Sequence, residues 1–229
     1  MFKFGFVLCA VLCAVLTLSQ GLYLAEKKVP EKNVDGMVNK LIQETTRGLQ
    51  PKISLPKMNE DFKLRVMIIN FRGTLEAEGG WLKNMTTLTR TGPVELKKDK
   101  ETVSVSFPVR LNELKFGFDE IKISVLSTGA SCSIDVSVGE NSFNVRFTVK
   151  KDKSGCTTTL DKTDVTSFKN FKTKATVRGR KVTPYVYNVG VNLMENQFYG
   201  KIGKSLSDYL KHHFDEVLKK NVMCQLLNM

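Results

Sequence analysis

Residues 132–150 read CSIDVSVGENSFNVRFTVK, and this stretch decides the class of fold. Apolar side chains stand at every second position over 132–138 and again over 143–149, with polar side chains between most of them. A period of two is typical of a strand that buries one face. The Gly-Glu-Asn segment at 139–141 interrupts the alternation, and a short Gly/Asn segment between two such runs predicts a β-hairpin turn.

The same alternation recurs in shorter runs across residues 62–191, for example at 62–66, 103–109 and 185–191. Its phase changes near Asp119, which predicts a bulge or a turn at that point. We count seven to nine strands, nearly all with one apolar and one polar face. This pattern is typical of an antiparallel sheet that is covered on one side only.

Two segments outside these strands carry a helical period instead. In residues 31–47 and 198–222 the apolar side chains recur at steps of three and four, as on one face of an α-helix. The sheet must bury its apolar face, and these two helices are the only partners available to it. The sequence therefore predicts one α+β domain over residues 22–229. We expect a highly curved antiparallel sheet wrapped around the long C-terminal helix, with an N-terminal amphipathic helix.

The N-terminal residues predict export from the cell. Residues 1–21 combine Lys3, an unbroken apolar run and small residues at the end, which is the pattern of a cleaved signal peptide. A membrane anchor is the alternative, but the run is shorter than the roughly 20 residues that a spanning helix needs. We therefore expect a secreted, extracellular protein. In such a protein Asn84, in the motif Asn-Met-Thr, is a predicted glycosylation site.

Removal of residues 1–21 leaves three cysteines, Cys132, Cys156 and Cys224. Cys132 with Cys156 is the favoured pair, although in a simple meander they would lie two strand spacings apart, about 9–10 Å. A disulfide needs Cα atoms within roughly 7 Å, so a turn would have to bend inward. Pairing of Cys224 with either strand cysteine, or with a second chain, remains an alternative.

The chain is basic, with 35 Lys and Arg against 23 Asp and Glu and a formal net charge of +12. Such a surplus favours anionic partners but does not define a fold. One group alternates with apolar residues and predicts a positive stripe along a sheet edge: Lys172, Lys174, Arg178, Arg180 and Lys181. For a secreted protein, anionic lipid, lipopolysaccharide or glycosaminoglycan is a more suitable partner than nucleic acid.

Motifs for catalysis are missing. The only histidines, His212 and His213, are adjacent in a predicted helix, where neighbouring side chains point about 100° apart and cannot share a metal ion. No nucleophile, phosphate-binding or metal-binding motif occurs. We therefore expect a non-enzymatic protein without cofactor or metal. The 14 Phe, 5 Tyr and 8 Met instead indicate a soft, aromatic interior, and adaptable Met side chains suit an irregular apolar guest.

Three short segments resemble a known family. Gly-Thr-Leu at 73–75, Trp-Leu-Lys-Asn-Met at 81–85 and Arg-Thr-Gly at 90–92 lead into the strand at 103–109. This order looks like the mite group 7 allergens, and the layout resembles the wider tubular lipid-binding superfamily. That superfamily includes bactericidal/permeability-increasing and lipopolysaccharide-binding proteins, takeout proteins and juvenile-hormone-binding proteins. The resemblance implies a super-roll that holds one lipid-like molecule between sheet and helix.

The resemblance and the apolar faces together give an expected ligand-lining set: Leu41, Ile42, Val105, Phe107, Phe116, Phe147, Tyr209, Leu210 and Phe214. The leading hypothesis is a secreted, non-enzymatic protein that holds a hydrophobic ligand in an apolar groove between sheet and helix. The alternative is a defence protein whose basic surface binds anionic microbial lipid or lipopolysaccharide. A filled core with no ligand is a third hypothesis.

Overall fold

The computed structural model describes residues 31–66, 69–125, 128–153, 155–177, 198–220, 223, 224 and 226. The chain divides into two compact units, Met1–Lys32 and Asn33–Met229, and the features below lie in the second, apart from the first two residues of helix α2. The predicted signal peptide at 1–21 and the predicted strand at 185–191 lie outside the described residues.

Helix α2 spans Glu31–Gly48 and confirms the first predicted helix. The side chains of Val34, Val38, Leu41 and Ile42 recur at helical spacing and are all buried, because they form the one apolar face of the helix. Its polar face is held to the sheet by Arg90, which donates to Asp35 over 2.5 Å and to Asn39 over 3.1 Å. Part of the family-like segment at 90–92 therefore positions this helix.

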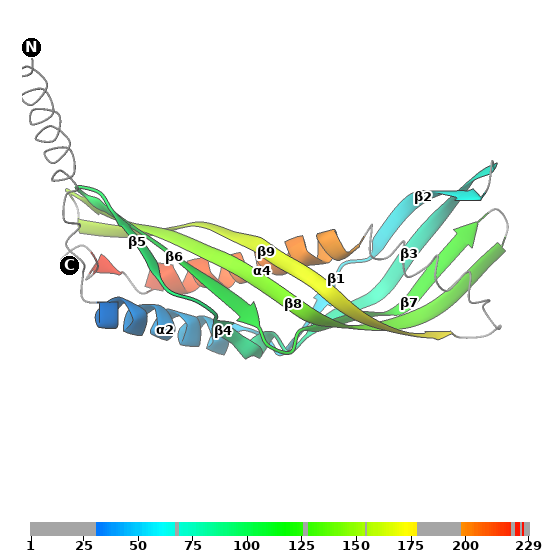
Figure 1. Ribbon diagram of the computed structural model, residues 1–229, viewed down its shortest axis with the longest axis horizontal. Helices are drawn as coiled ribbons and strands as arrows, with labels where there is room; N and C mark the ends of the chain where they lie inside the picture. Colours follow the sequence, from blue (N-terminus) through cyan, green and yellow to red (C-terminus); the bar gives the residue numbers. More distant parts are fainter. Residues whose placement is uncertain are drawn as a thin grey trace, which may run out of the picture. The chain divides into compact units, whose positions relative to one another are not determined.

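In the described part of the chain, nine strands form one antiparallel sheet (Figure 1). In chain order they are β1 Lys52–Leu55, β2 Met58–Val66, β3 Ile69–Lys83, β4 Leu88–Arg90, β5 Glu95–Lys98, β6 Thr102–Leu111, β7 Lys115–Val125, β8 Thr128–Asp152 and β9 Gly155–Val177, with the 3-10 helix η1 at Met85–Thr87. The hydrogen-bonded order is β1-β3-β7-β8-β6-β4, with β2 on β3, β5 on β6 and β9 on β8. The bulge predicted near Asp119 is confirmed, because the β7–β8 register shifts between Phe118 and Ile121.

Strand β8 is a continuous strand of 25 residues, so the hairpin turn predicted at 139–141 is wrong. One edge of β8 pairs with β9 along its length. Its other edge pairs first with β7, up to Ser137, and then with β6, from Phe143 onward. The interruption of the alternation thus marks a change of partner within one strand, which a sequence pattern cannot distinguish from a turn.

Asn141 joins β8 to β6 where the partner changes. Its side-chain amide donates to the carbonyl oxygen of Leu111 and accepts from the Leu111 N–H, each over 2.8 Å. The Asn141 side chain is buried, and its two hydrogen bonds take the place of one backbone pair of the ladder. Both ends of this contact are removed from water, so the loss of the amide would leave two buried groups without partners.

Helix α4 spans Tyr199–Lys220 and confirms the long C-terminal helix. Its 22 residues extend about 33 Å along the sheet, where it packs against β9. Phe214 of α4 contacts Phe107 of β6, which in turn contacts Phe147 of β8, with ring centroids 6.1 and 6.4 Å apart. The large antiparallel sheet with an N-terminal and a C-terminal helix confirms the predicted α+β class.

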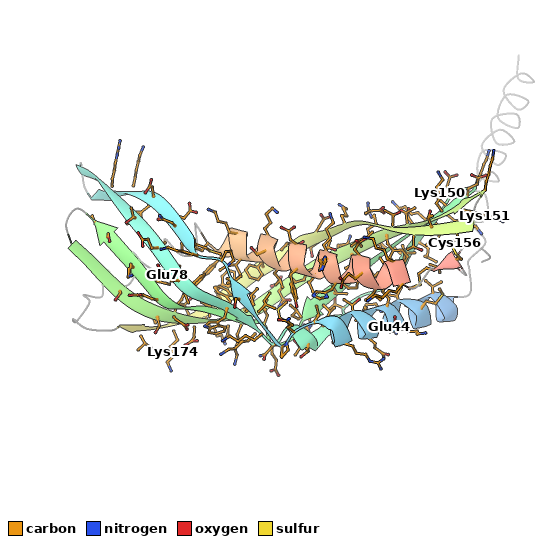
Figure 2. The ribbon with its side chains drawn as sticks, turned by 180° about the vertical axis from the view of Figure 1, so that it is seen from behind. Glu44, Glu78, Lys150, Lys151, Cys156 and Lys174 are labelled. Atoms are coloured by element: carbon orange, nitrogen blue, oxygen red, sulfur yellow. A yellow bond between two sulfur atoms is a disulfide. The ribbon has the colours of Figure 1, made fainter. Side chains whose placement is uncertain are left out.

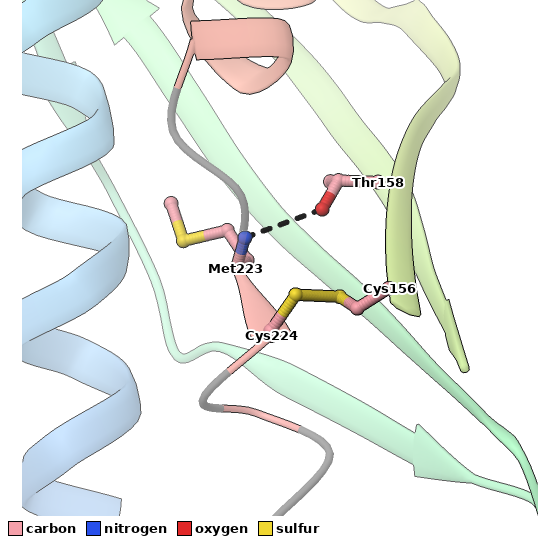
Figure 3. The surroundings of a disulfide bond; sticks show 4 residues. All are labelled: Cys156, Thr158, Met223 and Cys224. Carbon is pink, nitrogen blue, oxygen red and sulfur yellow. Dashed lines mark hydrogen bonds between the residues drawn. A yellow bond between two sulfur atoms is a disulfide. The ribbon is translucent and has the colours of Figure 1, made fainter. Parts of the chain in front are cut away.

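The disulfide joins Cys156 to Cys224, with Cα atoms 5.7 Å apart, and the favoured Cys132–Cys156 pair is wrong (Figure 3). Cys156 pairs across the sheet with Lys151, at the end of β8. Cys132 lies 19 residues earlier on the same strand, which is about 60 Å at 3.3 Å per residue. The register therefore places the two strand cysteines far apart. The disulfide ties the residues after α4 to the start of β9, where the Met223 N–H also donates to Thr158 Oγ1 over 3.3 Å.

Replacement of Asn141 by Ala is expected to lower the free energy of unfolding by about 2–5 kcal/mol, because the N–H and C=O of Leu111 lose their partners while buried. Asn59→Ala, at an exposed position of β2, is the matched control and should change it by less than about 0.5 kcal/mol. Urea unfolding of the three proteins measures the difference. Equal stability of the Asn141 and Asn59 variants would refute the role of the amide.

Removal of the disulfide by Cys156→Ser and Cys224→Ser is expected to cost about 4 kcal/mol, from the entropy of a loop closed over 68 residues. Cys132→Ser leaves the disulfide intact and should cost far less. Unfolding curves give these values, and non-reducing peptide mapping identifies the linked pair. A linked peptide that contains Cys132 would contradict the pairing.

Candidate ligand-binding site

A groove of about 570 Å³ lies between β9 and the first turns of α4. Its β9 side is formed by Thr163, Asp164, Val165, Phe168 and Phe171, and its α4 side by Tyr199, Gly200, Gly203, Lys204 and Ser207. The volume falls within the range of small-molecule sites, about 300–1,000 Å³. The groove therefore has the size and the place, between sheet and helix, expected for an apolar ligand.

A local shift in β8 and β9 puts two aromatic side chains on the same face of the sheet. Phe168 and Phe171 are three residues apart, so in a regular strand they would point to opposite faces. Asn170 adopts a left-handed backbone conformation (φ 59°) opposite Gly139, where a Cβ would lie 2.7 Å from the Asn170 carbonyl oxygen. Gly139 is thus required for the close approach, and the shift lets both rings line the groove.

Small residues on α4 make the room. Gly200, Gly203 and Ser207 recur at helical spacing on the side of α4 that lines the groove. A Cβ at Gly203 would lie 3.4 Å from the Phe168 ring, whereas one at Gly200 would meet no atom within 4 Å. Two hydrogen bonds join α4 to β9, one on each side of the two glycines. Ser207 donates to the Thr163 carbonyl, and the Tyr199 hydroxyl lies 3.0 Å from Thr173 Oγ1.

The floor of the groove is aromatic. Phe171 and Tyr199 have ring centroids 4.1 Å apart, and Phe168 and Phe171 are 5.2 Å apart. Phe116 of β7 lies beneath these three rings, with its own centroid 5.2 Å from that of Tyr199. Val165 at the rim is 38% exposed, more than any other large hydrophobic side chain in the described part of the chain. An apolar ligand would therefore find a preformed surface.

The rim of the groove carries charged side chains that already have partners. Lys204 pairs with Asp208 over 2.7 Å, and Asp164 pairs with Lys162. These groups are largely exposed, so each pair contributes little to stability and can exchange partners readily. A ligand with a polar end would meet this rim.

A second groove of about 550 Å³ lies on β2, β3 and the end of β7, and its lining is different in kind. Asp61, Lys63 and Arg72 contribute charged groups, while the Phe62 ring packs over Gly73 and is buried. The apolar surface is therefore covered. This groove does not offer the continuous aromatic floor of the first.

Eight of the nine predicted lining residues lie in the packed interior, and Tyr209 is half-buried. All except Tyr209 are buried, and none of the nine lines either groove: Leu41, Ile42, Val105, Phe107, Phe116, Phe147, Tyr209, Leu210 and Phe214. Only Phe116 makes ring contacts with the groove, to Phe168, Phe171 and Tyr199. The sequence reasoning missed those three aromatics. The Phe-x-x-Phe spacing at 168–171 and the small residues at the start of α4 were the available signals.

Of the predicted basic stripe, Lys172 and Lys174 are exposed on β9, whereas Arg178, Arg180 and Lys181 lie outside the described residues. Asn84 is half-buried at the start of η1, with φ 65°, and its Nδ2 donates to the Glu113 carbonyl over 2.8 Å. Glycosylation of Asn84 stays a prediction.

Titratable groups in the described ranges form no metal-binding cluster of three or more His, Cys, Asp or Glu. Burial raises the pKa of the unpaired Cys132 thiol, so the reactive thiolate is disfavoured there. Burial also lowers the pKa of His213, whose ring meets that of Tyr209 edge-to-face, with centroids 4.5 Å apart, and lies near Gly48 at the end of α2. Within the described residues, no helix combines the length and apolar character needed to cross a bilayer.

The described fold is that of an α+β protein with a large antiparallel sheet, two helices and an aromatic groove between sheet and helix. The family model of the Group 7 allergens matches residues 33–218. The chain belongs to the Group 7 allergen family, which confirms the resemblance in the sequence. A search of curated proteins finds no match.

Solved structures of two proteins resemble this chain. A crystal structure of lipopolysaccharide binding protein is 18% identical with a TM-score of 0.50, covering 82% of this chain and 37% of that chain. Takeout 1 of Epiphyas postvittana is 11% identical with a TM-score of 0.31, covering 85% of this chain and 92% of that one. The chain thus spans little more than a third of the first of these structures, and that likeness establishes the fold alone.

The His213 environment predicts a stability that depends on pH. Because its pKa in the folded state is below the usual 6.5, the unfolded chain binds a proton more readily, and stability falls as pH decreases from 7.5 through the folded-state pKa. His213→Gln should flatten this dependence, whereas His212→Gln, at an exposed neighbouring position, should not. Urea unfolding at pH 7.5 and 5.5 measures both, and an unchanged slope in the His213 variant would contradict the assignment.

Proposed function

We propose that this protein is a secreted, non-enzymatic binding protein that holds a hydrophobic, lipid-like molecule in the groove between β9 and α4. The observation that carries the proposal is the aromatic floor of the groove, where the partly exposed rings of Phe168 and Phe171 contact the buried rings of Tyr199 and Phe116. Aromatic side chains lose little conformational freedom on contact with a ligand, and burial of apolar surface favours binding by roughly 25 cal/mol per Å².

The groove suits a ligand with a long apolar part and one polar end. The apolar part would lie over the rings and the two glycines of α4. A polar or anionic end would lie at the rim, within reach of Lys204. A fatty acid or an isoprenoid alcohol has this division of polarity.

Secretion is supported by the disulfide, since such bonds persist in oxidising compartments. The solved structure of lipopolysaccharide binding protein shares the fold, and its name states that this relative in fold binds lipopolysaccharide.

Gly200→Leu tests the groove directly, because its side chain would project into space that is empty of protein atoms. Gly36→Leu is the matched control: it is also a helical glycine whose Cβ would meet no atom within 4 Å, but it lies on α2 and outside the groove. We expect Gly200→Leu to raise the Kd for a fluorescent fatty-acid probe about tenfold or more, as overfilling of a site costs about 1–3 kcal/mol.

Gly36→Leu should leave the Kd within about twofold, and both variants should gain slightly in helix stability. Fluorescence titration of the mature protein gives the Kd values. Equal probe affinity in the wild type and the Gly200→Leu variant would refute the groove, as would a native mass spectrum of probe-saturated protein without bound probe.

Salt separates this proposal from the alternative, in which a basic surface binds anionic microbial lipid. Apolar burial in the groove should survive 1 M NaCl, because the Debye length falls to about 3 Å there and only charge contacts are screened. We expect the probe Kd to change less than about threefold between 0.1 and 1 M NaCl. A steep loss of binding with salt would favour the basic surface.

A further inference from the structure

A row of lysines crosses the outer face of the sheet. The strand register places Lys52 of β1 beside Lys83 of β3, and Lys83 beside Lys115 of β7. Lys115 pairs with Ser137 of β8, which pairs with Lys172 of β9. Residues in register share one face, so four lysines and one serine form a straight line across five adjacent strands. We call these four lysines the lysine row.

The row lies on the face opposite the core. In each of the three central strands, a residue adjacent to the row is buried: Leu82 in β3, Phe116 in β7 and Val136 in β8. Neighbouring residues in a strand point to opposite faces, so the side chains of the row point away from the core. All four lysines are exposed, and no described carboxylate lies within 4 Å of any of them. The row is thus a line of uncompensated positive charge.

Such a row does not stabilise the sheet. Like charges directly opposite each other on neighbouring strands are destabilising, and the row contains two such pairs in succession, Lys52–Lys83 and Lys83–Lys115. The centre of the row is nevertheless firmly supported. Lys83 Nζ lies 4.1 Å from the ring centroid of Trp81, and Trp81 packs over Gly117, where a Cβ would lie only 2.4 Å from the indole. Uncompensated charge on a rigid support suits an anionic partner.

We propose that the lysine row binds a linear sulfated polysaccharide. Neighbouring strands are about 4.8 Å apart, so the row spans about 19 Å in one line. Acidic side chains lie on both sides of it: Asp135 is two residues from Ser137 on one side, and Glu140, paired with Lys169, is three residues away on the other. A linear polyanion can follow the row without meeting these carboxylates, whereas a planar anionic membrane would face them as well.

The row also differs from a nucleic-acid site. Single-stranded nucleic acids stack their bases on exposed aromatic rings, but the Trp81 beside the row is only 7% exposed. The disulfide favours an oxidising, extracellular setting, where sulfated polysaccharides supply the polyanion. The proposed surface is on the opposite side of the sheet from the core. It therefore does not depend on a ligand in the groove, although it shares the extracellular location proposed above.

The test compares two variants with the same change in net charge. In the row variant, Lys52, Lys83, Lys115 and Lys172 are replaced by Gln. In the control variant the exposed Lys97, Lys98, Lys150 and Lys151 are replaced by Gln. Figure 2 shows Lys150 and Lys151 near Cys156, far along the sheet from Lys174. Lys174 is two residues from Lys172 of the row, so it marks the position of the row in the figure.

The probe is heparin, measured by calorimetry at several NaCl concentrations. We expect the row variant to bind about tenfold or more weakly at 0.15 M NaCl, because its four charge contacts with the polyanion are lost. Its dependence of log Kd on log salt should also be shallower, since fewer counterions are released. The control variant should stay within about twofold of the wild type. An Arg variant of the same four positions should retain binding, because the charge is kept.

Equal losses in the row and control variants would overturn the proposal, because net charge alone would then explain binding. A lack of heparin binding by the wild type would also overturn it, as would row-dependent binding to phosphatidylserine vesicles or to single-stranded DNA that exceeds binding to heparin. Thermal unfolding checks the fold, and the row variant should unfold at the same or a higher temperature than the wild type. The fatty-acid probe titration is a separate readout, so failure of the groove and failure of the row are distinguishable.

Discussion

The hydrogen bonds between the Asn141 amide and the backbone of Leu111 allow one strand to serve two halves of the sheet. Strand β8 has β9 on one edge throughout, while β7 and then β6 occupy the other. At a change of partner a ladder normally leaves backbone groups unpaired, and in a buried position each would be costly. The amide satisfies these groups, so that Phe107 on β6 and Phe116 on β7 belong to one continuous apolar face. That face is the one on which α4 packs.

The groove arises from a small irregularity beside this joint. The shift at Gly139 and Asn170 rotates the strand phase, and two rings that would otherwise point apart then line the same space. Two glycines on α4 keep the helix from filling that space. Local irregularity in the strands and small side chains on the helix thus act together, and a more regular sheet with larger helical residues would close the groove.

Features that depend on the hydrophobic period of one element could be predicted from the sequence. Features that depend on the pairing of strands far apart in the chain could not. Helical spacing located α2 and α4, and alternation located the strands, because each reflects a single element that buries one face. The disulfide partner of Cys156 and the continuity of β8 depend on which strands are neighbours, and residues far apart in sequence decide that. The lysine row has the same origin: Lys52, Lys83 and Lys115 lie about thirty residues apart in the chain. Phe168 and Phe171 were missed because an alternating pattern assigns them to opposite faces.

The order of the elements along the chain has a consequence for biosynthesis. All nine described strands precede α4, so in a chain that emerges from the ribosome these strands are made before the helix that covers them is available. The inner face, with Phe107 and Phe147, meets Phe214 only after α4 has been made. Until then the nascent sheet presents an aromatic surface of the kind that chaperones bind. Cys156 and Cys224 can be oxidised to the disulfide only after that point, so the presence of the bond marks the chains in which α4 has docked.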